Sequence, residues 1–250
     1  DLQVEYSDHL SKIETTEQRD TFMRDVIGDK DRQMLSSQME AFYQQALSQS
    51  VADQHPWRLV GNQIPMARIH APEIVSMLST GVIGSLTMLP PHIRDFLRCC
   101  KFDLPLSPDT WDGYPVARER FYEQTQAQNV RDLLVLTGDS HCFWANELFD
   151  QKGTAMGLEL GTTSITSPSD FASTGSTASG LMSNQLIDHN DEVRWTDSWH
   201  HGYLKLTLNK ERALAQFLAV TDILTENFQV QKIKELEIVK ADQTLKYVEV

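Results

Sequence analysis

The chain has 250 residues, of which 40% are hydrophobic and 23% are charged, which is the balance of a folded globular protein. Its net charge of −13 argues against a surface that binds nucleic-acid phosphates. No apolar run approaches the roughly 20 residues of a membrane-spanning helix. The three cysteines, Cys99, Cys100 and Cys142, do not suit a disulfide framework. The chain starts without Met and shows no signal peptide, so we expect a processed protein or a fragment.

The first quarter of the chain predicts a polar lead-in, a helix and a strand. Residues 1–30 are polar with weak helical periodicity, so we expect them to pack loosely. Ser37 and Glu40 have the spacing of a capping box, which predicts a helix over residues 37–49. Residues 57–65 read as a strand that leads into polar turn residues.

The middle of the chain predicts a helix, a buried strand and a second helix. Residues 111–115 (Trp-Asp-Gly-Tyr-Pro) form an aromatic turn, and Pro115 suits the first position of a helix over residues 116–128. Residues 133–137 are a short apolar run without helical periodicity, so we expect a central, parallel strand. A helix is expected over residues 142–149.

After residue 150 the chain predicts strands joined by polar loops. Residues 157–160 read as a strand, and residues 167–185 are rich in Ser, Thr, Gly and Ala and read as a mobile loop. Further strands are expected over residues 201–208, 213–221, 234–239 and 244–250, the first two as a hairpin. Helices that alternate with strands make the predicted fold class α/β.

The expected strand over residues 133–137 ends in Gly-Asp-Ser-His at residues 138–141. Ligands of open α/β sheets bind at the carboxyl ends of strands. Gly138 permits a sharp turn, which places Asp139 and His141 on one side of it. A hard oxygen ligand and an imidazole in that arrangement can bind one metal ion or two adjacent ones. The alternative is that Asp139 caps the next helix and His141 is a boundary residue.

Several stretches together resemble the alkaline phosphatase D (PhoD-like) metallophosphatases, which belong to the calcineurin-like metallophosphoesterases. The Gly-Asp-x-His and Trp-Asp-Gly-Tyr-Pro sequences are the most specific of them. The matching stretches, in the family's order, are residues 33–47, 57–65, 111–115 with Arg118, 136–141 with Trp144 and Leu148, Glu159 with 164–168, and 201–203. The family's earlier metal-ligand motifs have no counterpart upstream of Gly138. The resemblance therefore implies that residues 1–250 are the C-terminal half of a two-sheet sandwich flanked by helices.

The resemblance implies metal-dependent hydrolysis of phosphate esters, with a metal-activated water as nucleophile. Asp139 and His141 correspond to the last ligand pair of a metal centre described with iron and calcium in some members. Asp112, Arg118 and His201 would lie near the substrate. From their patterns alone, however, they read as a turn former, a solvated helix cation and a structural histidine. A small phosphate ester is the implied partner, the implied location is periplasmic or secreted, and the oligomeric state stays open.

Two other interpretations fit some of the same residues. In a GDSL-type serine esterase, Ser140 would be the nucleophile, His200 the base and Asp197 the orienting acid. Asn62 would imitate the oxyanion asparagine of that family, but it precedes the Ser block here, and this order argues against the esterase. The third interpretation is a truncated, non-catalytic domain that binds a partner or only folds.

Overall fold

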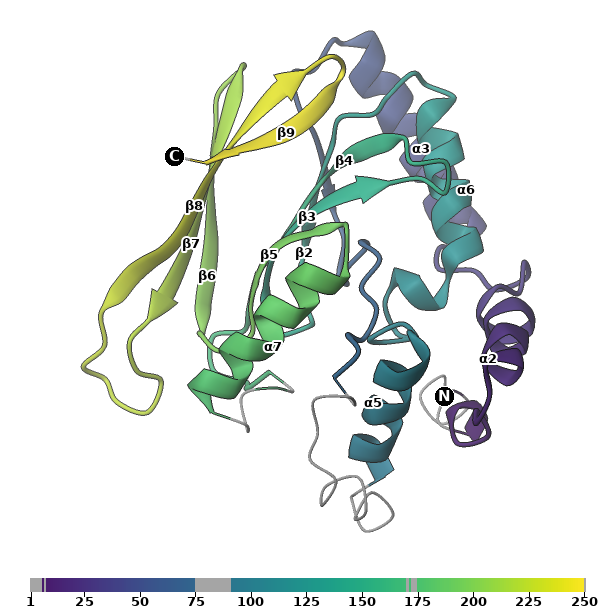
Figure 1. The fold of residues 1–250 in the computed structure, drawn as a ribbon. Helices are drawn as coiled ribbons and strands as arrows, with labels where there is room; N and C mark the ends of the chain where they lie inside the picture. Colours follow the sequence, from purple (N-terminus) through teal and green to yellow (C-terminus); the bar gives the residue numbers. More distant parts are fainter. Residues whose placement is uncertain (1–5, 7, 75–90, 170, 172–174, 250) are drawn as a thin grey trace.

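The structure, a computed structural model, describes residues 6, 8–74, 91–169, 171 and 175–249. Two β-sheets face each other, and helices cover the outer face of one of them (Figure 1). The five-stranded sheet contains β1 (Arg58–Gly61), β2 (Leu133–Thr137), β3 (Phe143–Phe149), β4 (Ala155–Gly161) and β5 (Val193–Asp197). The four-stranded sheet contains β6 (Gly202–Leu208), β7 (Arg212–Val220), β8 (Val230–Ala241) and β9 (Thr244–Glu249). The fold is therefore mixed α/β with two sheets.

The helices belong to the first half of the chain, apart from one that precedes β5. They are α2 (Thr16–Phe22), a π-helical turn η1 (Met23–Ile27), α3 (Ser37–Ala52), α5 (Pro91–Phe102), a 3-10 turn η4 (Trp111–Gly113), α6 (Pro115–Gln126) and α7 (Ser176–His189). In the part of the chain that the structure describes, no helix has the length and apolarity needed to cross a membrane. All three cysteines are buried, and none of them forms a disulfide bond with another described residue.

Strand order explains where the functional residues lie. The five-stranded sheet runs β1-β2-β4-β3-β5, and β2 pairs in parallel with both β1 and β4. This confirms the predicted central, parallel strand. β3 is antiparallel to β4 and to β5, so β5 points the same way as β4. The ends of β1, β2, β4 and β5 consequently share one edge with the start of β3, and we call this edge the carboxyl edge.

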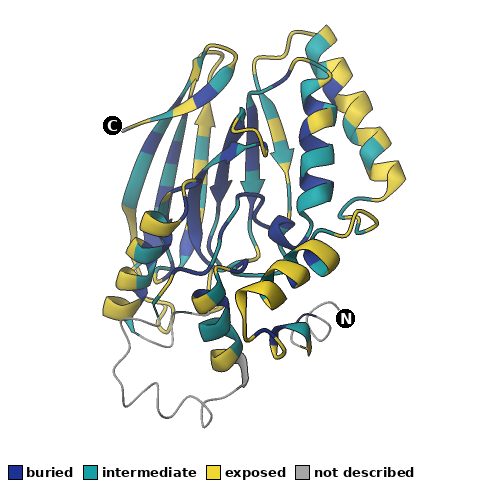
Figure 2. Ribbon diagram, turned by 45° about the vertical axis from the view of Figure 1, so that its right-hand side comes forward, coloured by how far each residue is buried: buried dark blue, intermediate teal, exposed yellow. Residues whose placement is uncertain are grey.

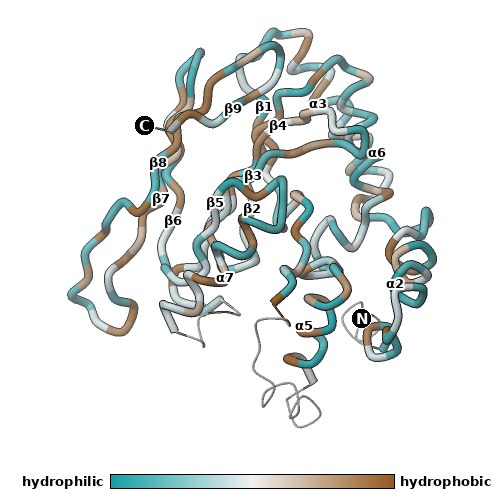
Figure 3. Tube along the Cα trace, in the orientation of Figure 1, coloured by the Kyte–Doolittle hydropathy of each residue, from teal (hydrophilic) through white to brown (hydrophobic). Residues whose placement is uncertain are grey.

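Alternation along β2 divides the interior into two cores. Leu134 packs between the two sheets with residues such as Leu158 and Phe217. Leu133 and Val135 point to the opposite face, where α3 and α6 cover them. Four of the five residues of β2 are buried, and Figure 2 shows that burial is concentrated in the central strands, where Figure 3 shows many hydrophobic residues. Burying each of these side chains stabilises the fold by about 2 kcal/mol. Because its side chains enter both clusters, β2 is shared by the two cores.

The helix predicted over residues 142–149 is wrong, because this segment is β3. Its side chains are buried on both faces of the sheet, which removes the period-two alternation that marks a half-buried strand. The predicted helix over residues 37–49 is confirmed, with Ser36 instead of Ser37 as the N-cap residue. Leu47 lies on the buried face of this helix, whereas Phe42 is 73% exposed.

Two segments are more ordered than their composition predicts. In residues 1–30, expected to pack loosely, Leu10, Ile13, Phe22 and Ile27 are buried in a third cluster. Buried Cys99, Cys100 and Leu104 from α5 and the turn after it complete this cluster.

The expected mobile loop over residues 167–185 forms the first part of α7 from Ser176 onward, while residues 170 and 172–174 lie outside the described part. Ser179, Ser183 and Leu186 form the buried face of α7. Their spacing is helical, but two of them are serines, and this hid the pattern from a search for apolar residues.

Candidate active site at the carboxyl edge

The turn over residues 138–142 connects β2 to β3 across the end of β4. Asp139 and His141 both adopt left-handed backbone conformations, with φ of 67° and 53°. Asp and His tolerate this region better than most residues, although it still costs free energy. Gly161 lies against this connection, where a Cβ atom would come within 2.8 Å of the Trp144 ring. The local sequence thus forms a tight turn that presents two candidate ligands side by side.

His141 is oriented as a metal-binding imidazole would be. Its Nδ1 lies 2.9 Å from the carbonyl oxygen of Pro168. A carbonyl only accepts hydrogen bonds, so Nδ1 carries the proton and Nε2 keeps its lone pair. Such a bond from the second nitrogen to a backbone carbonyl is the usual support of a ligating histidine.

Asp139 supplies a charged oxygen beside this imidazole. Its side chain is exposed, and within the described residues it has no hydrogen-bond or ion-pair partner. A carboxylate and an imidazole suit a hard or intermediate cation. However, no group of three His, Cys, Asp or Glu side chains in the described ranges is placed to hold a metal ion. Asp139 and His141 therefore fit part of a metal centre and do not complete one.

The loop that follows β4 joins this turn to the turn that follows β5. The Thr163 hydroxyl lies 2.9 Å from the His141 carbonyl oxygen and 3.1 Å from that of His200. The Gly202 amide also donates to the Ser164 carbonyl at 3.0 Å. Sequence reasoning assigned no role to Thr163, whose only signal was its position just after a predicted strand.

Asp197 and His200 form a pair at the end of β5. The His200 Nδ1 lies 2.9 Å from the Asp197 carboxylate, and this hydrogen bond raises the pKa of His200. Burial alone would raise the pKa of Asp197, but the bond to His200 holds it below its ordinary value. Asp197 also accepts the His200 backbone amide at 2.8 Å.

The esterase constellation is not assembled around this pair. The Ser140 hydroxyl accepts a hydrogen bond from Trp144 Nε1 at 2.8 Å, and no bond joins it to His200 in the described part of the chain. Asn62 accepts from Trp111 Nε1 and donates to the Ile64 carbonyl, as a turn amide does. The predicted oxyanion asparagine therefore has both ends of its side chain occupied.

Asp112 and Arg118, predicted near the substrate, form a buried ion pair at 2.7 Å. Each residue is only 4% exposed. Burial would lower the pKa of Arg118, but the charge and hydrogen bond of Asp112, together with other acidic groups around it, outweigh burial and raise this pKa. The reading of Arg118 as a solvated helix cation is therefore wrong. The same pair holds the segment over residues 66–70, because Asp112 accepts the Ile69 amide at 2.6 Å and Arg118 donates to the Met66 carbonyl.

The extended segment over residues 66–70, which we call the strap, crosses the interior outside both sheets. Side chains accept all five of its backbone N–H groups. Glu159 accepts those of Met66 and Ala67, Glu192 that of Arg68, Asp112 that of Ile69 and Asn190 that of His70, at distances of 2.6–3.1 Å. Burial raises the pKa of Glu159 to about 7, against the opposing effect of the amides it binds. The carboxylates that hold the strap are thus occupied by backbone amides and by the side chains of Arg118, Arg68 and Asn146.

His201, the third predicted substrate contact, lies just before β6. Its Nε2 is enclosed and has no hydrogen-bond partner among the described residues. Thr137 Oγ1, at the end of β2, is likewise buried without a partner there. A contact between His201 and substrate stays a prediction.

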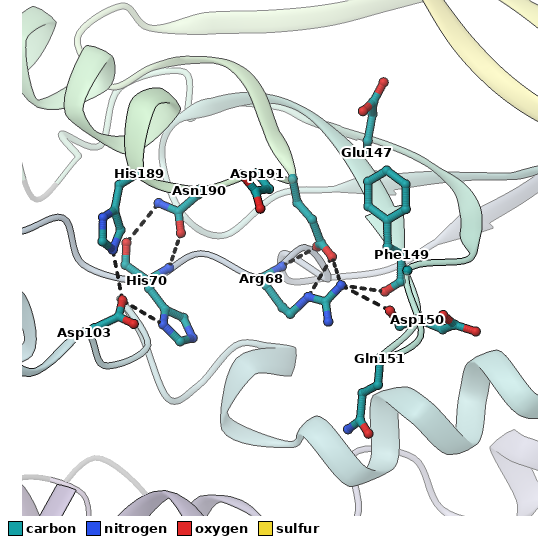
Figure 4. Close-up of a pocket in the computed structure, with 12 residues that line it drawn as sticks. Arg68, His70, Asp103, Glu147, Phe149, Asp150, Gln151, His189, Asn190 and Asp191 are labelled. Atoms are coloured by element: carbon teal, nitrogen blue, oxygen red, sulfur yellow. Dashed lines mark hydrogen bonds and ion pairs between the residues drawn. The ribbon is translucent and has the colours of Figure 1, made fainter. Parts of the chain in front are cut away.

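A cleft of about 660 Å³ opens at the opposite edge of the five-stranded sheet (Figure 4). Arg68, the loop after β3 and the end of α7 line it. His70 and His189 both bond to one oxygen of Asp103, at 3.1 and 2.9 Å. None of the site residues predicted from the sequence lines this cleft.

Comparison with known proteins places the chain in a family. A family model described as PhoD-like phosphatase matches residues 6–217. Alkaline phosphatase D of Bacillus subtilis (strain 168) is 29% identical over 142 residues, which are 55% of this chain and 23% of that protein. A solved structure titled "Structure of PhoD" superimposes with a TM-score of 0.64 at 21% identity, covering 89% of this chain and 37% of the other. The chain therefore spans well under half of each relative, and it belongs to the PhoD-like phosphatase family.

Proposed function

We propose that this chain contributes one wall of a metal-dependent phosphate-ester hydrolase. The proposal is carried by the pair at the carboxyl edge. Asp139 is an exposed carboxylate without a partner among the described residues, and the bond from His141 Nδ1 to Pro168 leaves Nε2 available. Membership of the PhoD-like phosphatase family supports a hydrolase that acts on phosphate esters.

In this proposal Asp139 would hold metal through a carboxylate oxygen and His141 through Nε2. Bound metal would neutralise charge on the phosphoryl oxygens and lower the pKa of the attacking water. The chain's own contribution is to fix these donors. The tight turn aims Asp139, the Pro168 carbonyl orients the His141 ring, and the Thr163 hydroxyl holds the His141 backbone. Calcium and iron are the proposed metals, on the resemblance alone.

Two donors do not fill the coordination shell of a hard cation, which takes six or more ligands when it is calcium. We propose that further ligands come from sequence outside residues 1–250, since this chain covers 37% of the solved PhoD chain. In the same proposal these residues are the C-terminal half of a calcineurin-like sandwich, and the whole protein acts in the periplasm or outside the cell on a small phosphate ester.

The test uses the full natural protein with Asp139→Asn and His141→Ala. Both changes should remove bound metal, measured by elemental analysis, and should lower p-nitrophenyl phosphate turnover by roughly a thousandfold, because metal supplies several kcal/mol of transition-state stabilisation. Asp25→Asn, at an exposed position, is the matched control and should change neither quantity. Full turnover in either site variant would contradict the proposal, and a wild-type protein without turnover would favour the non-catalytic interpretation.

A further inference from the structure

The Asp197–His200 pair lies beside the candidate metal turn, yet the proposed function leaves it without a role. We propose that His200 is the acid that protonates the leaving-group oxygen during phosphate-ester hydrolysis, and that Asp197 is its positioning residue. This inference rests on the proposed function and adds a catalytic residue to it.

The turn that follows β2 and the turn that follows β5 lie close together. The carbonyl oxygens of His141 and His200 each lie within about 3 Å of the same Thr163 hydroxyl. The Gly202 amide and the Ser164 carbonyl join the same two regions at 3.0 Å. A side chain at position 200 is therefore within reach of a phosphate ester that contacts metal at Asp139 and His141.

Asp197 fixes the orientation of the His200 ring. The Asp197 carboxylate accepts Nδ1–H of His200 with one oxygen and the His200 backbone amide with the other, at 2.9 and 2.8 Å. His200 is thus held once through its ring and once through its backbone, and Nε2–H lies on the side of the ring away from Asp197. The His200 side chain is 33% exposed, whereas Nε2 of His201 is buried. A fixed imidazole with one accessible N–H is the geometry of a proton donor.

The hydrogen bond to Asp197 raises the pKa of His200, which favours the protonated form of the ring. Other titratable groups near it are His201, which follows it in the chain, and Asp139 and His141 on the neighbouring turn.

The proton balance of the step is complete without any further reactant. Water oxygen bonds to phosphorus while the bond from phosphorus to the leaving oxygen breaks. His200 transfers its Nε2 proton to that oxygen and an alcohol departs. The attacking water releases one proton to solvent, and His200 takes one back from solvent, so that one water is consumed per ester.

The experiment compares two esters in the full natural protein. p-Nitrophenyl phosphate has a leaving group that departs as a stable anion, whereas glycerol phosphate must release an alkoxide unless it is protonated. His200→Asn should lower kcat on glycerol phosphate about a hundredfold and on p-nitrophenyl phosphate less than about threefold. His55→Asn, at an exposed histidine after α3, is the control and should alter neither rate.

Asp197→Asn supplies a readout that a merely structural role would not move. Loss of the carboxylate lowers the pKa of His200, so the basic limb of the kcat profile on glycerol phosphate should shift to lower pH. Equal losses on both esters in His200→Asn, with metal content intact, would overturn the proton-donor role while the phosphatase stands. Unchanged rates on both esters would overturn it as well. A wild-type protein that hydrolyses neither ester would remove the proposed function and this inference together.

Discussion

The carboxylates around the strap and the Asp139 carboxylate at the carboxyl edge differ in burial and in the number of bonds they make. Around the strap, Glu159, Glu192 and Asp112 are buried, and their oxygens bind backbone amides or arginine. At the carboxyl edge, Asp139 is exposed and has no partner within the described residues. A carboxylate near a motif is therefore a candidate ligand only if its oxygens are not already bonded to other groups of the protein.

The strap explains why so many charges are tolerated inside. An extended segment that joins no sheet leaves its amides without acceptors, and each orphaned buried amide costs roughly 1–3 kcal/mol. Carboxylates and one asparagine replace the missing strand and accept five consecutive amides. Arg118 and Arg68 balance two of the buried charges. The polar network is therefore the support of a buried loop.

The largest effect should come from removing one member of that support. Asp112→Ala leaves Arg118 charged and buried and leaves the Ile69 amide without its acceptor. We expect a loss of about 3–5 kcal/mol in the free energy of unfolding, measured by urea denaturation. Asp25→Ala removes a partner of Arg24 at the same 2.7 Å distance on the surface, and it should leave the midpoint unchanged. Equal stability of the two variants would break the comparison between used and free carboxylates.

This network also marks the limit of what the sequence predicts. β1, β2 and the β6–β7 hairpin follow from local apolar patterns, whereas the ligand roles of Asp139 and His141, inferred from their place after β2, stay predictions. The partners of the strap do not, because Glu159 and Glu192 lie 93 and 124 residues from the amides of Met66 and Arg68 that they bind. No local period encodes such pairs. The Trp-Asp-Gly-Tyr-Pro turn was identified correctly, yet its Asp112 binds backbone.

The buried Glu159 should also make the free energy of unfolding depend on pH. Glu159 has a pKa of about 7 in the folded protein because burial disfavours its charge, against an ordinary value of 4.5. A raised pKa in the folded state gives stability that is complete below pH 4.5 and is lost as pH rises through 7. Relative to Glu159→Gln, the wild-type protein should therefore lose about 3 kcal/mol between about pH 4.5 and pH 8, measured by denaturation at each pH. A constant difference between the two proteins would show that the strap amides fully offset burial.

A third variant, Ser140→Ala, separates packing from chemistry inside the candidate turn. The hydroxyl accepts a hydrogen bond from Trp144 Nε1, and Trp144 is only 2% exposed. Removing the hydroxyl leaves this buried N–H without an acceptor, which should lower the free energy of unfolding by about 1–2 kcal/mol. Phosphatase activity of the full natural protein should stay within about threefold, since Ser140 provides no ligand in the proposed centre. Activity that disappears with Ser140 and resists chelators would instead revive the serine esterase.

The smallest effect should have the opposite sign. Asp139 lies in the left-handed region at φ of 67°, where a side chain costs free energy and glycine does not. Because the carboxylate makes no bond within the described residues, Asp139→Gly should raise the free energy of unfolding by about 0.5–1 kcal/mol. The same variant should lose metal and turnover in the full natural protein. A residue kept as a metal ligand can lower the free energy of unfolding through its backbone conformation. A helix cap or a salt-bridge partner would instead raise it. If Asp139→Gly lowers stability as Asp112→Ala does, Asp139 is a structural residue and the candidate site must be sought elsewhere.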